Sequence, residues 1–206
     1  MPTFDLSELP AGEPYRILSS LVLPRPIAWI TTVDADTGVV NAAPFSFFNL
    51  IGSDPPICAV GVRAEKDRTA EPKDTARNLS HIGVGFVVNL VDEDNAVAMN
   101  ETAVELPAHE SEIEHAGLTL APTVTVAPVP RIASAPASLE CRVAEVVTIG
   151  NNRVVIASIG YVHLRDDLWD ADKRRVLAER AHLVGRMHGG SFYTRTRDLF
   201  SLDRPK

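Results

Sequence analysis

Short apolar runs of β-strand length recur along the chain, whereas stretches with a helical repeat of apolar positions are few and short. The runs are rich in valine, isoleucine and threonine and are bounded by glycine, proline, asparagine and aspartate, as strands in hairpins are. The predicted strands are 27–33, 39–43, 57–62, 81–90, 137–149 and 154–164. Turns at 34–38 and 150–153 join the first pair and the last pair into hairpins, and positive φ is expected at the two asparagines of the second turn.

Three short helices are predicted between these strands, at residues 14–21, 74–79 and 92–100. A proline fits the first turn of the first helix, Asp74 fits the capping position of the second, and acidic residues open the third. Long antiparallel strands separated by short helices favour a closed or nearly closed antiparallel barrel. A parallel doubly wound sheet would need a regular alternation of strands and helices, which the pattern lacks.

The composition is that of a folded protein, and the charge narrows its partners. The chain has 206 residues, of which 45% are hydrophobic and 23% charged. No change of composition marks a linker, so we expect a single domain over residues 1–206 with a proline-rich insertion at 107–136. A net charge of −7 disfavours a nucleic-acid-binding surface, which depends on cations that neutralise phosphates. No apolar run reaches the ~18 residues of a membrane span and no basic, apolar leader opens the chain, so we expect a cytoplasmic protein.

Several common sites are missing from the sequence. Cys58 and Cys141 form no Cys-x-x-Cys pair and lie in apolar stretches, so we expect buried free thiols. Neither a dinucleotide fingerprint, a P-loop nor a nucleophile elbow is present. The glycines of residues 83–85 stand inside a predicted strand and are expected to serve packing or a bulge. The two histidines that bound residues 109–115 would face different sides of a helix, so we expect a solvated acidic loop or helix start there and not a metal site.

Three segments carry residues suited to a flat, phosphorylated ligand. In residues 24–32, Arg25 stands between two prolines at the start of a strand; the alternative is an edge strand with a solvent-facing arginine. Residues 41–49 gather three phenylalanines with serine and asparagine, which suits a flat heterocycle with a polar rim; the alternative is an aromatic corner of the core. In residues 71–78, Lys73 precedes a helix start and a hydroxyl, which suits a phosphate monoester; the alternative is an ordinary helix cap.

In this order along the chain, these segments and several others resemble the flavin reductase-like, FMN-binding split-barrel family, over about residues 15–205. The family includes small flavin reductases, flavoredoxins and reductase partners of two-component monooxygenases. The marks of the resemblance are 24–29, 41–49, 54–56, Lys73-Asp74-Thr75 with Asn78, 86–89, 139–141, and Gly185-Arg186 with Gly189, Gly190 and Tyr193. The resemblance implies a mainly β protein with short helices, folded as a six-stranded antiparallel split β-barrel. It also implies a homodimer with FMN near the dimer interface.

The resemblance further assigns residues to the cofactor. The residues expected along the flavin ring and ribityl chain are Ile30, Thr31, Thr32, Ser46, Phe47, Phe48 and Asn49. Those expected at the phosphate are Lys73, Thr75 and, after the third strand, Arg63. Arg186 and His188 are expected near the open face of the flavin. In the family a glycine pair often follows the arginine more closely, whereas here Met187 and His188 stand between Arg186 and the pair. The alternative for His188 is an exposed loop imidazole.

The activity that the resemblance implies is that of an NAD(P)H-dependent flavin reductase. Hydride passes from nicotinamide to flavin when the two rings stack, so the protein has to position the rings and needs no acid–base triad. The alternative is an FMN-binding electron carrier or flavin-storage protein without nicotinamide turnover. The electron donor is NADH or NADPH, and a flavin-dependent monooxygenase is the expected partner.

Overall fold

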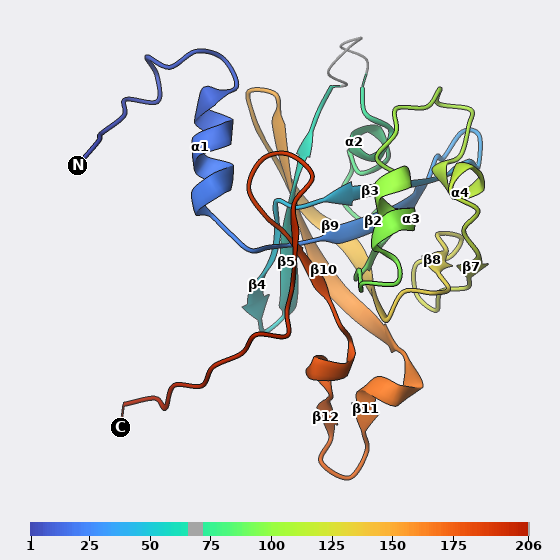
Figure 1. The fold of residues 1–206 in the computed structure, drawn as a ribbon. Helices are drawn as coiled ribbons and strands as arrows, with labels where there is room; N and C mark the ends of the chain where they lie inside the picture. Colours follow the sequence, from blue (N-terminus) through green and yellow to red (C-terminus); the bar gives the residue numbers. More distant parts are fainter. Residues whose placement is uncertain (66–71, 206) are drawn as a thin grey trace.

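Seven antiparallel strands form the main sheet of the computed structural model, which describes residues 1–65 and 72–205 (Figure 1). They are β2 (Ala28–Val33), β3 (Val40–Phe45), β4 (Phe48–Ser53), β5 (Pro56–Arg63), β6 (Gly85–Asn89), β9 (Ala137–Ile149) and β10 (Asn152–Leu164). Their order across the sheet is β3-β2-β6-β9-β10-β5-β4. Side chains alternate between the two faces, so that β5 buries Cys58, Val60 and Val62 at every second position.

The two edge strands of this sheet are neighbours in the sequence. β3 ends at Phe45 and β4 begins at Phe48, so only Ser46 and Phe47 connect the two edges. At this corner the backbone N–H of Gly61 donates to the carbonyl of Phe47 at 2.7 Å. The sheet therefore curls until its edges meet at one corner, while β3 and β4 form no ladder with each other in the described residues. The expected mainly β split barrel is confirmed.

The barrel has seven strands where six were expected, because β4 was not predicted. The first residue of β4, Phe48, is buried, and the five residues after it are exposed. No alternation of apolar and polar positions marks such a strand in the sequence. Phe48 and Asn49, expected within an aromatic cluster along the flavin, thus belong to an edge strand that pairs with β5.

All three predicted helices are present with shifted ends, as α1 (Glu13–Leu21), α2 (Asp74–Asn78) and α3 (Ala96–Glu101). The prediction that Asp74 caps α2 is wrong, because Lys73 is the capping residue and Asp74 is already helical. The start predicted for α3 is also wrong. Residues 92–95 form a turn instead, in which the carboxylate of Asp92 accepts a hydrogen bond from the backbone N–H of Asn95 at 3.1 Å.

A fourth helix, α4 (Glu112–His115), occupies the segment expected to be a solvated acidic loop or helix start. The helix start is present, but the expectation that the segment is solvated is wrong for Glu112, which is only 6% exposed. Its carboxylate accepts a hydrogen bond from the backbone N–H of Ala42 in β3 at 3.2 Å. This bond fixes α4 against the edge of the barrel.

Short elements complete the fold. They are β1 (Arg25–Pro26), β13 (Val184–Arg186) and β14 (Tyr193–Arg195) in one sheet, β7 (Leu120–Ala121) with β8 (Arg131–Ile132), β11 (Trp169–Asp170) with β12 (Arg175–Val176), and the 3₁₀ turns η1 (Asp166–Leu168) and η2 (Ala178–Arg180). The hairpin of β9 and β10 turns through Gly150 and Asn151. Positive φ falls on Gly150 (φ 57°) and not on the two asparagines, which corrects the expectation; glycine adopts it without a Cβ clash.

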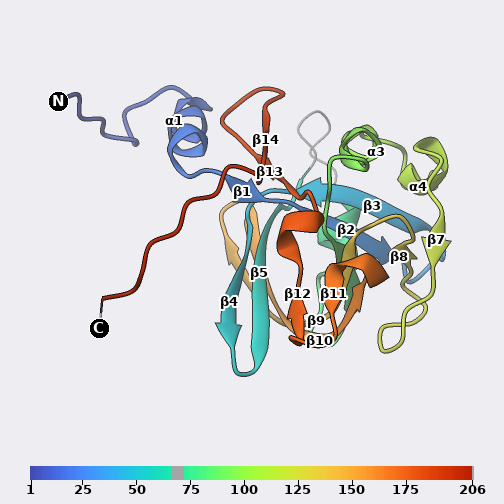
Figure 2. The ribbon, with the colours of Figure 1, turned by 60° about the horizontal axis from the view of Figure 1, so that its bottom comes forward.

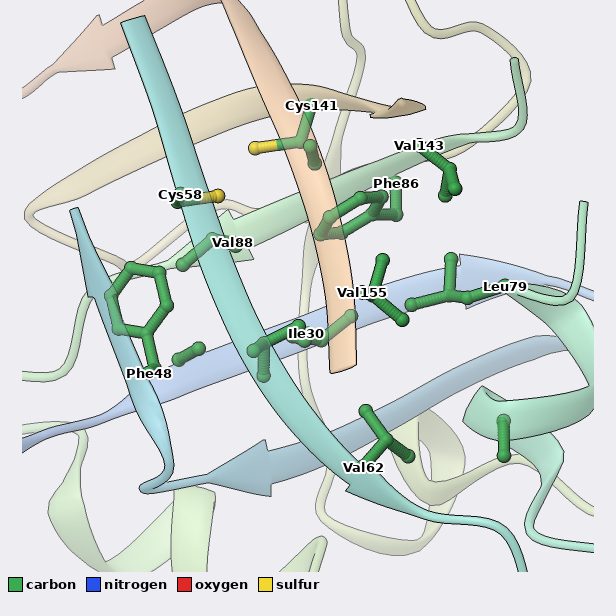
Figure 3. Close-up of a cluster of buried hydrophobic side chains, with 14 residues drawn as sticks. Ile30, Phe48, Cys58, Val62, Leu79, Phe86, Val88, Cys141, Val143 and Val155 are labelled. Carbon is green, nitrogen blue, oxygen red and sulfur yellow. The ribbon is translucent and has the colours of Figure 1, made fainter. Parts of the chain in front are cut away.

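The interior of the barrel is a layer of small apolar side chains around Phe86 (Figure 3). Cys58 and Cys141 are both buried and free, as expected. Their sulfur atoms turn toward each other in this layer. Contact with Cys58 and burial raise the pKa of the Cys141 thiol, so it stays protonated and acts as a small apolar group. Gly85 is required for packing, because a Cβ there would come within 2.8 Å of Val126.

A buried carboxylate ties the proline-rich insertion to the barrel. Glu140 of β9 accepts hydrogen bonds from the backbone N–H groups of Val124 and Thr125 at 2.7 and 2.6 Å and from the Thr125 hydroxyl at 2.5 Å. The ring of His163 lies 2.6 Å from the same carboxylate. Burial alone would raise the pKa of Glu140, but the donors from Thr125, Val124 and His163 outweigh it and hold the pKa at about 2.

The helices are divided between two sides of the barrel. α2, α3 and α4 lie together near β3, and α1 stands apart on the side toward which both termini extend (Figures 1 and 2). The β11–β12 hairpin projects from the end of β10. Among the described residues, no helix is long and apolar enough to cross a membrane.

Candidate functional site

Two adjoining cavities lie between β3 and the segments that cover it. The first, here called the lysine cavity, has a volume of about 160 Å³ and is lined by Asn41, Ala43, Pro44, Phe45, Lys73, Asp74, Thr75, residues 102–106 and Glu112. The second, the tyrosine cavity, has a volume of about 240 Å³ and is lined by Tyr15, Ile27, Pro44, Phe45, Ser46, Met99, Asn100, Ala103, Arg186 and Tyr193. Small-molecule sites usually span ~300–1,000 Å³, so neither cavity alone holds a large ligand. Because Pro44, Phe45 and Ala103 belong to both, the two cavities adjoin along the end of β3, and together they are here called the groove.

The end of β3 forms the middle of this groove. Pro44 of β3 lies opposite Trp29 of β2, and β2 is the only strand of the main sheet that pairs with β3 in the described residues. Proline is tolerated there because β3 is an edge strand and needs no second ladder. Opposite it, the segment after α3 is fixed by Thr102, whose hydroxyl accepts a hydrogen bond from the Trp29 indole N–H at 2.8 Å. Both walls of the groove are thus anchored on the same buried tryptophan.

The lysine cavity combines one cation with hydroxyl, amide and carboxylate groups. Within the described part of the chain, Lys73 has no ion-pair partner, and its side chain is half-buried. The Asn41 amide lies between Thr75 and Glu112, and we assign its oxygen to the Thr75 hydroxyl (3.0 Å) and its nitrogen to the Glu112 carboxylate oxygens (3.3 and 3.2 Å). The opposite orientation would place the amide oxygen against a carboxylate. The ammonium group of Lys73 can therefore donate to a bound anion. The Thr75 hydroxyl donates to Asn41 and would have to rotate before it could donate to the same anion.

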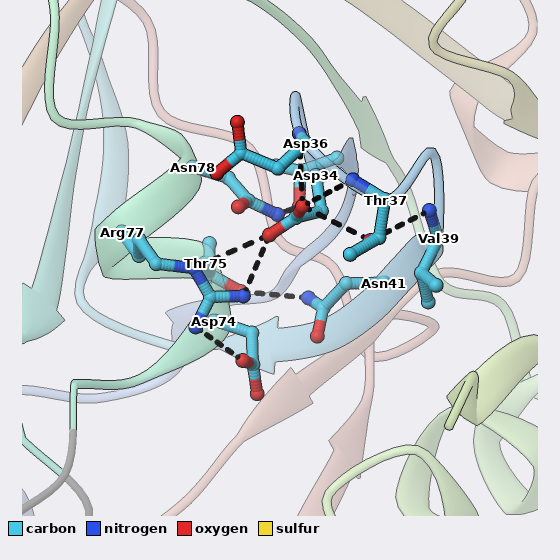
Figure 4. A network of polar contacts seen from close by, with 10 residues as sticks. Asp34, Asp36, Thr37, Val39, Asn41, Asp74, Thr75, Arg77 and Asn78 are labelled. Atoms are coloured by element: carbon cyan, nitrogen blue, oxygen red, sulfur yellow. Dashed lines mark hydrogen bonds and ion pairs between the residues drawn. The ribbon is translucent and has the colours of Figure 1, made fainter. Parts of the chain in front are cut away.

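A polar network positions the short helix that carries Thr75 (Figure 4). The Arg77 guanidinium pairs with Asp34 in the β2–β3 turn at 2.8 Å and with Asp74 at 2.9 Å. The Asn78 side-chain amide donates to the hydroxyl of Thr32 at 2.9 Å. The Thr37 backbone N–H and the Arg77 guanidinium hold the pKa of Asp34 at about 2, so the pair with Arg77 persists at neutral pH.

The tyrosine cavity is walled by aromatic rings with polar groups at their edges. The Arg186 guanidinium carbon lies 4.7 Å from the centre of the Tyr193 ring, in a cation–π contact. The Tyr193 hydroxyl donates to the side-chain oxygen of Asn100 at 3.2 Å. Ser46 contributes a hydroxyl from the corner between β3 and β4. These groups provide donors and acceptors around a space suited to a flat ring.

Four of the predicted site residues meet in this groove. Lys73 and Thr75 line the lysine cavity, and Ser46 and Arg186 line the tyrosine cavity. Lys73 and Arg186, which are more than a hundred residues apart in the sequence, thus lie in adjoining cavities.

The other predicted residues lie elsewhere. Ile30 packs in the barrel interior, and the Thr31 hydroxyl donates to the carbonyl of Pro130 at 2.6 Å. Thr32 is 1% exposed and receives the Asn78 amide. None of the three lines either cavity, because β2 is a central strand whose inward and outward faces are both covered.

Three further predicted residues line a neighbouring hollow. Phe47, Phe48 and Asn49 lie there with Arg25, and Ser46 belongs both to this hollow and to the tyrosine cavity. Arg63 ends β5, opposite Asn152 of β10. His188 is exposed, with its ring 4.7 Å from that of Phe192.

The structure adds residues to the site that sequence reasoning missed. Tyr15, Asn100 and Glu112 line the groove but were not assigned to it, and Tyr193 was noted only as a mark of the resemblance. Glu112 was set aside with a segment expected to be solvated. For Tyr15 and Asn100 no signal was available, since only the packing of α1 and α3 brings them to the groove.

Two adjoining cavities on a split barrel, one with Lys73 among carboxylates and hydroxyls and one walled by aromatic rings and Arg186, form the candidate site. The chain belongs to the flavin reductase-like family, whose description "Flavin reductase like domain" matches residues 19–178. In structure it is similar to nitrilotriacetate monooxygenase component B from Bacillus cereus, with 33% identity, a TM-score of 0.89 and 98% of each chain covered. It is also similar to the 2-nitrobenzoate 2-nitroreductase of Pseudomonas fluorescens, with 34% identity, a TM-score of 0.87, and 99% of this chain and 96% of that chain covered. An uncharacterized protein of Deinococcus radiodurans is 42% identical over 205 residues, which are 98% of this chain and 88% of the relative.

Proposed function

We propose that this protein binds FMN in the groove and reduces it with NADH or NADPH. The observation that carries the proposal is that two cavities adjoin at Pro44 and Phe45, one with the half-buried Lys73 and the other with Ser46 and aromatic rings. FMN has the matching order of parts: a phosphate at one end, a hydroxylated chain and a flat ring with a polar rim. The names of the two similar solved proteins, a monooxygenase component B and a nitroreductase, support a redox role.

Each part of the groove has a task in this proposal. Lys73 donates to the phosphate as a charge-assisted partner, and the Thr75 hydroxyl joins it after its proton turns. Asn41 and Glu112 offer acceptors for ribityl hydroxyls. Ser46 and Asn100 supply hydrogen-bonding groups for the ring edge. When bound, the flavin supplies the hydride acceptor and electron store, which no side chain can provide.

Steady-state assays test the proposal. The FMN-loaded protein is mixed with NADH or NADPH, with and without added free FMN, and oxidation of the nicotinamide is followed. We expect turnover with at least one of the two donors that depends on flavin. A protein that holds FMN but oxidises neither donor would move the function to the alternative below.

A second candidate is an FMN-binding electron carrier or flavin-storage protein. It is favoured by the position of Arg186, which stacks on Tyr193 and donates to the carbonyl of Gly190 in its own loop. An arginine engaged in this way closes the end of the barrel and needs no nicotinamide. The two candidates share the groove and differ in whether Arg186 serves a second substrate.

Replacing Arg186 with alanine separates these roles. If the arginine guides nicotinamide, the variant keeps its bound FMN and its melting temperature, and KM for the donor rises roughly tenfold, the effect of about 1.4 kcal/mol. Arg175→Ala, on the exposed β12 strand, serves as the control and leaves KM unchanged. Loss of FMN or of folding with an unchanged KM would assign Arg186 a structural role.

We further propose a homodimer that delivers reduced flavin to a flavin-dependent monooxygenase. The edge strand β4 presents Leu50 (62% exposed) and Ile51 (51% exposed), and no described strand pairs with its side opposite β5, whereas natural edge strands are usually covered. Light scattering is expected to give twice the chain mass of 22.3 kDa. A particle of one chain mass at micromolar concentration would contradict the dimer.

A further inference from the structure

Arg25 is a buried arginine whose role the proposed function does not use. It is 5% exposed, and the described residues place no carboxylate within ion-pair distance of it, so the solvent-facing alternative considered for it is wrong. Its guanidinium donates to the carbonyls of Ser19 at 2.7 Å, Val22 at 2.9 Å and Met187 at 2.9 Å. Its Nε lies 3.4 Å from the hydroxyl of Ser46, which accepts a fourth bond.

These partners come from three separate segments, each of which forms a wall of the tyrosine cavity. Ser19 and Val22 lie at the end of α1, which carries Tyr15 into the cavity. Met187 directly follows Arg186, another wall residue. Ser46 itself lines the cavity. One side chain thus connects α1, the β3–β4 corner and the end of β13.

The chemistry of the guanidinium suits this task. Its donors lie in one plane in a fixed fork, so they set the directions of several acceptors together. Its hydrogen bonds use both terminal nitrogens and Nε. A lysine could keep the charge but would offer one rotating ammonium group, which cannot reach three walls in a fixed geometry. Since burying a charge requires strong compensation, the three carbonyls must stay close to the guanidinium.

We propose that Arg25 is a positioning residue that sets the shape of the tyrosine cavity by holding its three walls together. For the identity of the ligand the inference rests on the proposed function. The coupling of the walls does not depend on a ligand. It predicts that α1 and the segment after β13 both become more mobile when the Arg25 guanidinium is replaced.

The test compares Arg25→Lys with Arg142→Lys in the full chain. Arg142 is the control because it also bridges two segments by donating to backbone carbonyls, those of Gly83 and Thr125, but it is exposed and lies on another part of the barrel. Amide hydrogen exchange is measured without flavin, and FMN affinity and the visible circular dichroism of bound flavin are measured after loading. For Arg25→Lys we expect exchange in residues 13–22 and 187–193 to accelerate together, roughly tenfold, with FMN affinity weakened by a similar factor and an altered dichroism band. Arg142→Lys leaves all three unchanged.

Two results would overturn the inference. One is an Arg25→Lys protein that exchanges like the wild type in both segments, or in which only one segment changes. The other is a lower melting temperature with unchanged FMN affinity and dichroism, which would make the residue merely structural. Failure of the proposed function is recognised separately, as a wild-type protein that binds no FMN, and the exchange experiment still decides the coupling in that case.

Discussion

Replacing Lys73 with alanine is expected to weaken FMN binding by about 1.5–3 kcal/mol, roughly 10- to 150-fold, without unfolding the barrel. Lys73 is the cation of the lysine cavity without an ion-pair partner among the described residues, so its donors are available to a phosphate. The side chain contributes little to packing, because it is half-buried at the rim of the cavity. Fluorescence titration of the flavin-free protein with FMN measures the affinity, and a melting curve checks the fold.

Lys173→Ala provides the matched control for this measurement. Lys173 lies on the exposed turn between β11 and β12, far along the chain from the groove, and its loss should leave FMN affinity unchanged. An affinity of Lys73→Ala equal to that of the wild type would show that the phosphate binds elsewhere, and the orientation proposed for FMN would then be wrong.

Replacing Glu140 with alanine is expected to produce the largest loss of stability, about 3 kcal/mol. The carboxylate is fully buried and accepts three hydrogen bonds from Val124 and Thr125 besides its contact with His163. Without it, two backbone N–H groups lose their acceptors and the proline-rich insertion loses its main attachment to β9. Urea denaturation measures the change in free energy of unfolding. Glu145→Ala, exposed on the same strand, is the control, and an equal effect of the two changes would contradict the account.

The same residue makes the stability depend on pH. The pKa of Glu140 lies at about 2 in the folded chain, below its ordinary value of 4.5, so folding favours the ionised form. Its contribution is complete above pH 4.5 and is lost as the pH falls toward 2. The stability difference between the wild type and Glu140→Gln should therefore shrink over this window, a comparison that removes the shared contribution of Asp34.

The curled barrel could be predicted from the sequence because most of its strands have a recognisable local pattern of apolar residues. The hairpin of β9 and β10 is thirteen residues on each side with apolar residues at the expected spacing. β4 could not be predicted, since an edge strand that buries only Phe48 has no alternating pattern. The starts of α2 and α3 were wrong for a different reason. The Asp92 carboxylate bonds to the backbone of Asn95 and stabilises a turn where a helix was predicted, and Asp74 pairs with Arg77 one turn further along α2.

The candidate site was predictable only where a residue type carries chemistry by itself. Lys73 and Arg186 are charged residues in distinctive local sequences, and the structure places both in the groove. Thr31 and Thr32 looked equally suitable, but a central strand buries both of its faces. Tyr15 and Asn100 reach the groove through the packing of α1 and α3. The sequence contains no local sign of that packing.

Anaerobic mixing of the FMN-loaded protein with NADH and with NADPH shows directly whether the protein is a flavin reductase. Before loading, the protein is desalted as purified and any bound ligand is identified by mass spectrometry; after loading, the visible absorbance of the flavin is followed in a stopped-flow instrument. We expect the flavin that purifies with the protein to be FMN and not FAD, and at least one of the two donors to bleach the flavin band rapidly. FAD as the main ligand, or a flavin band that neither donor bleaches, would contradict the proposed function.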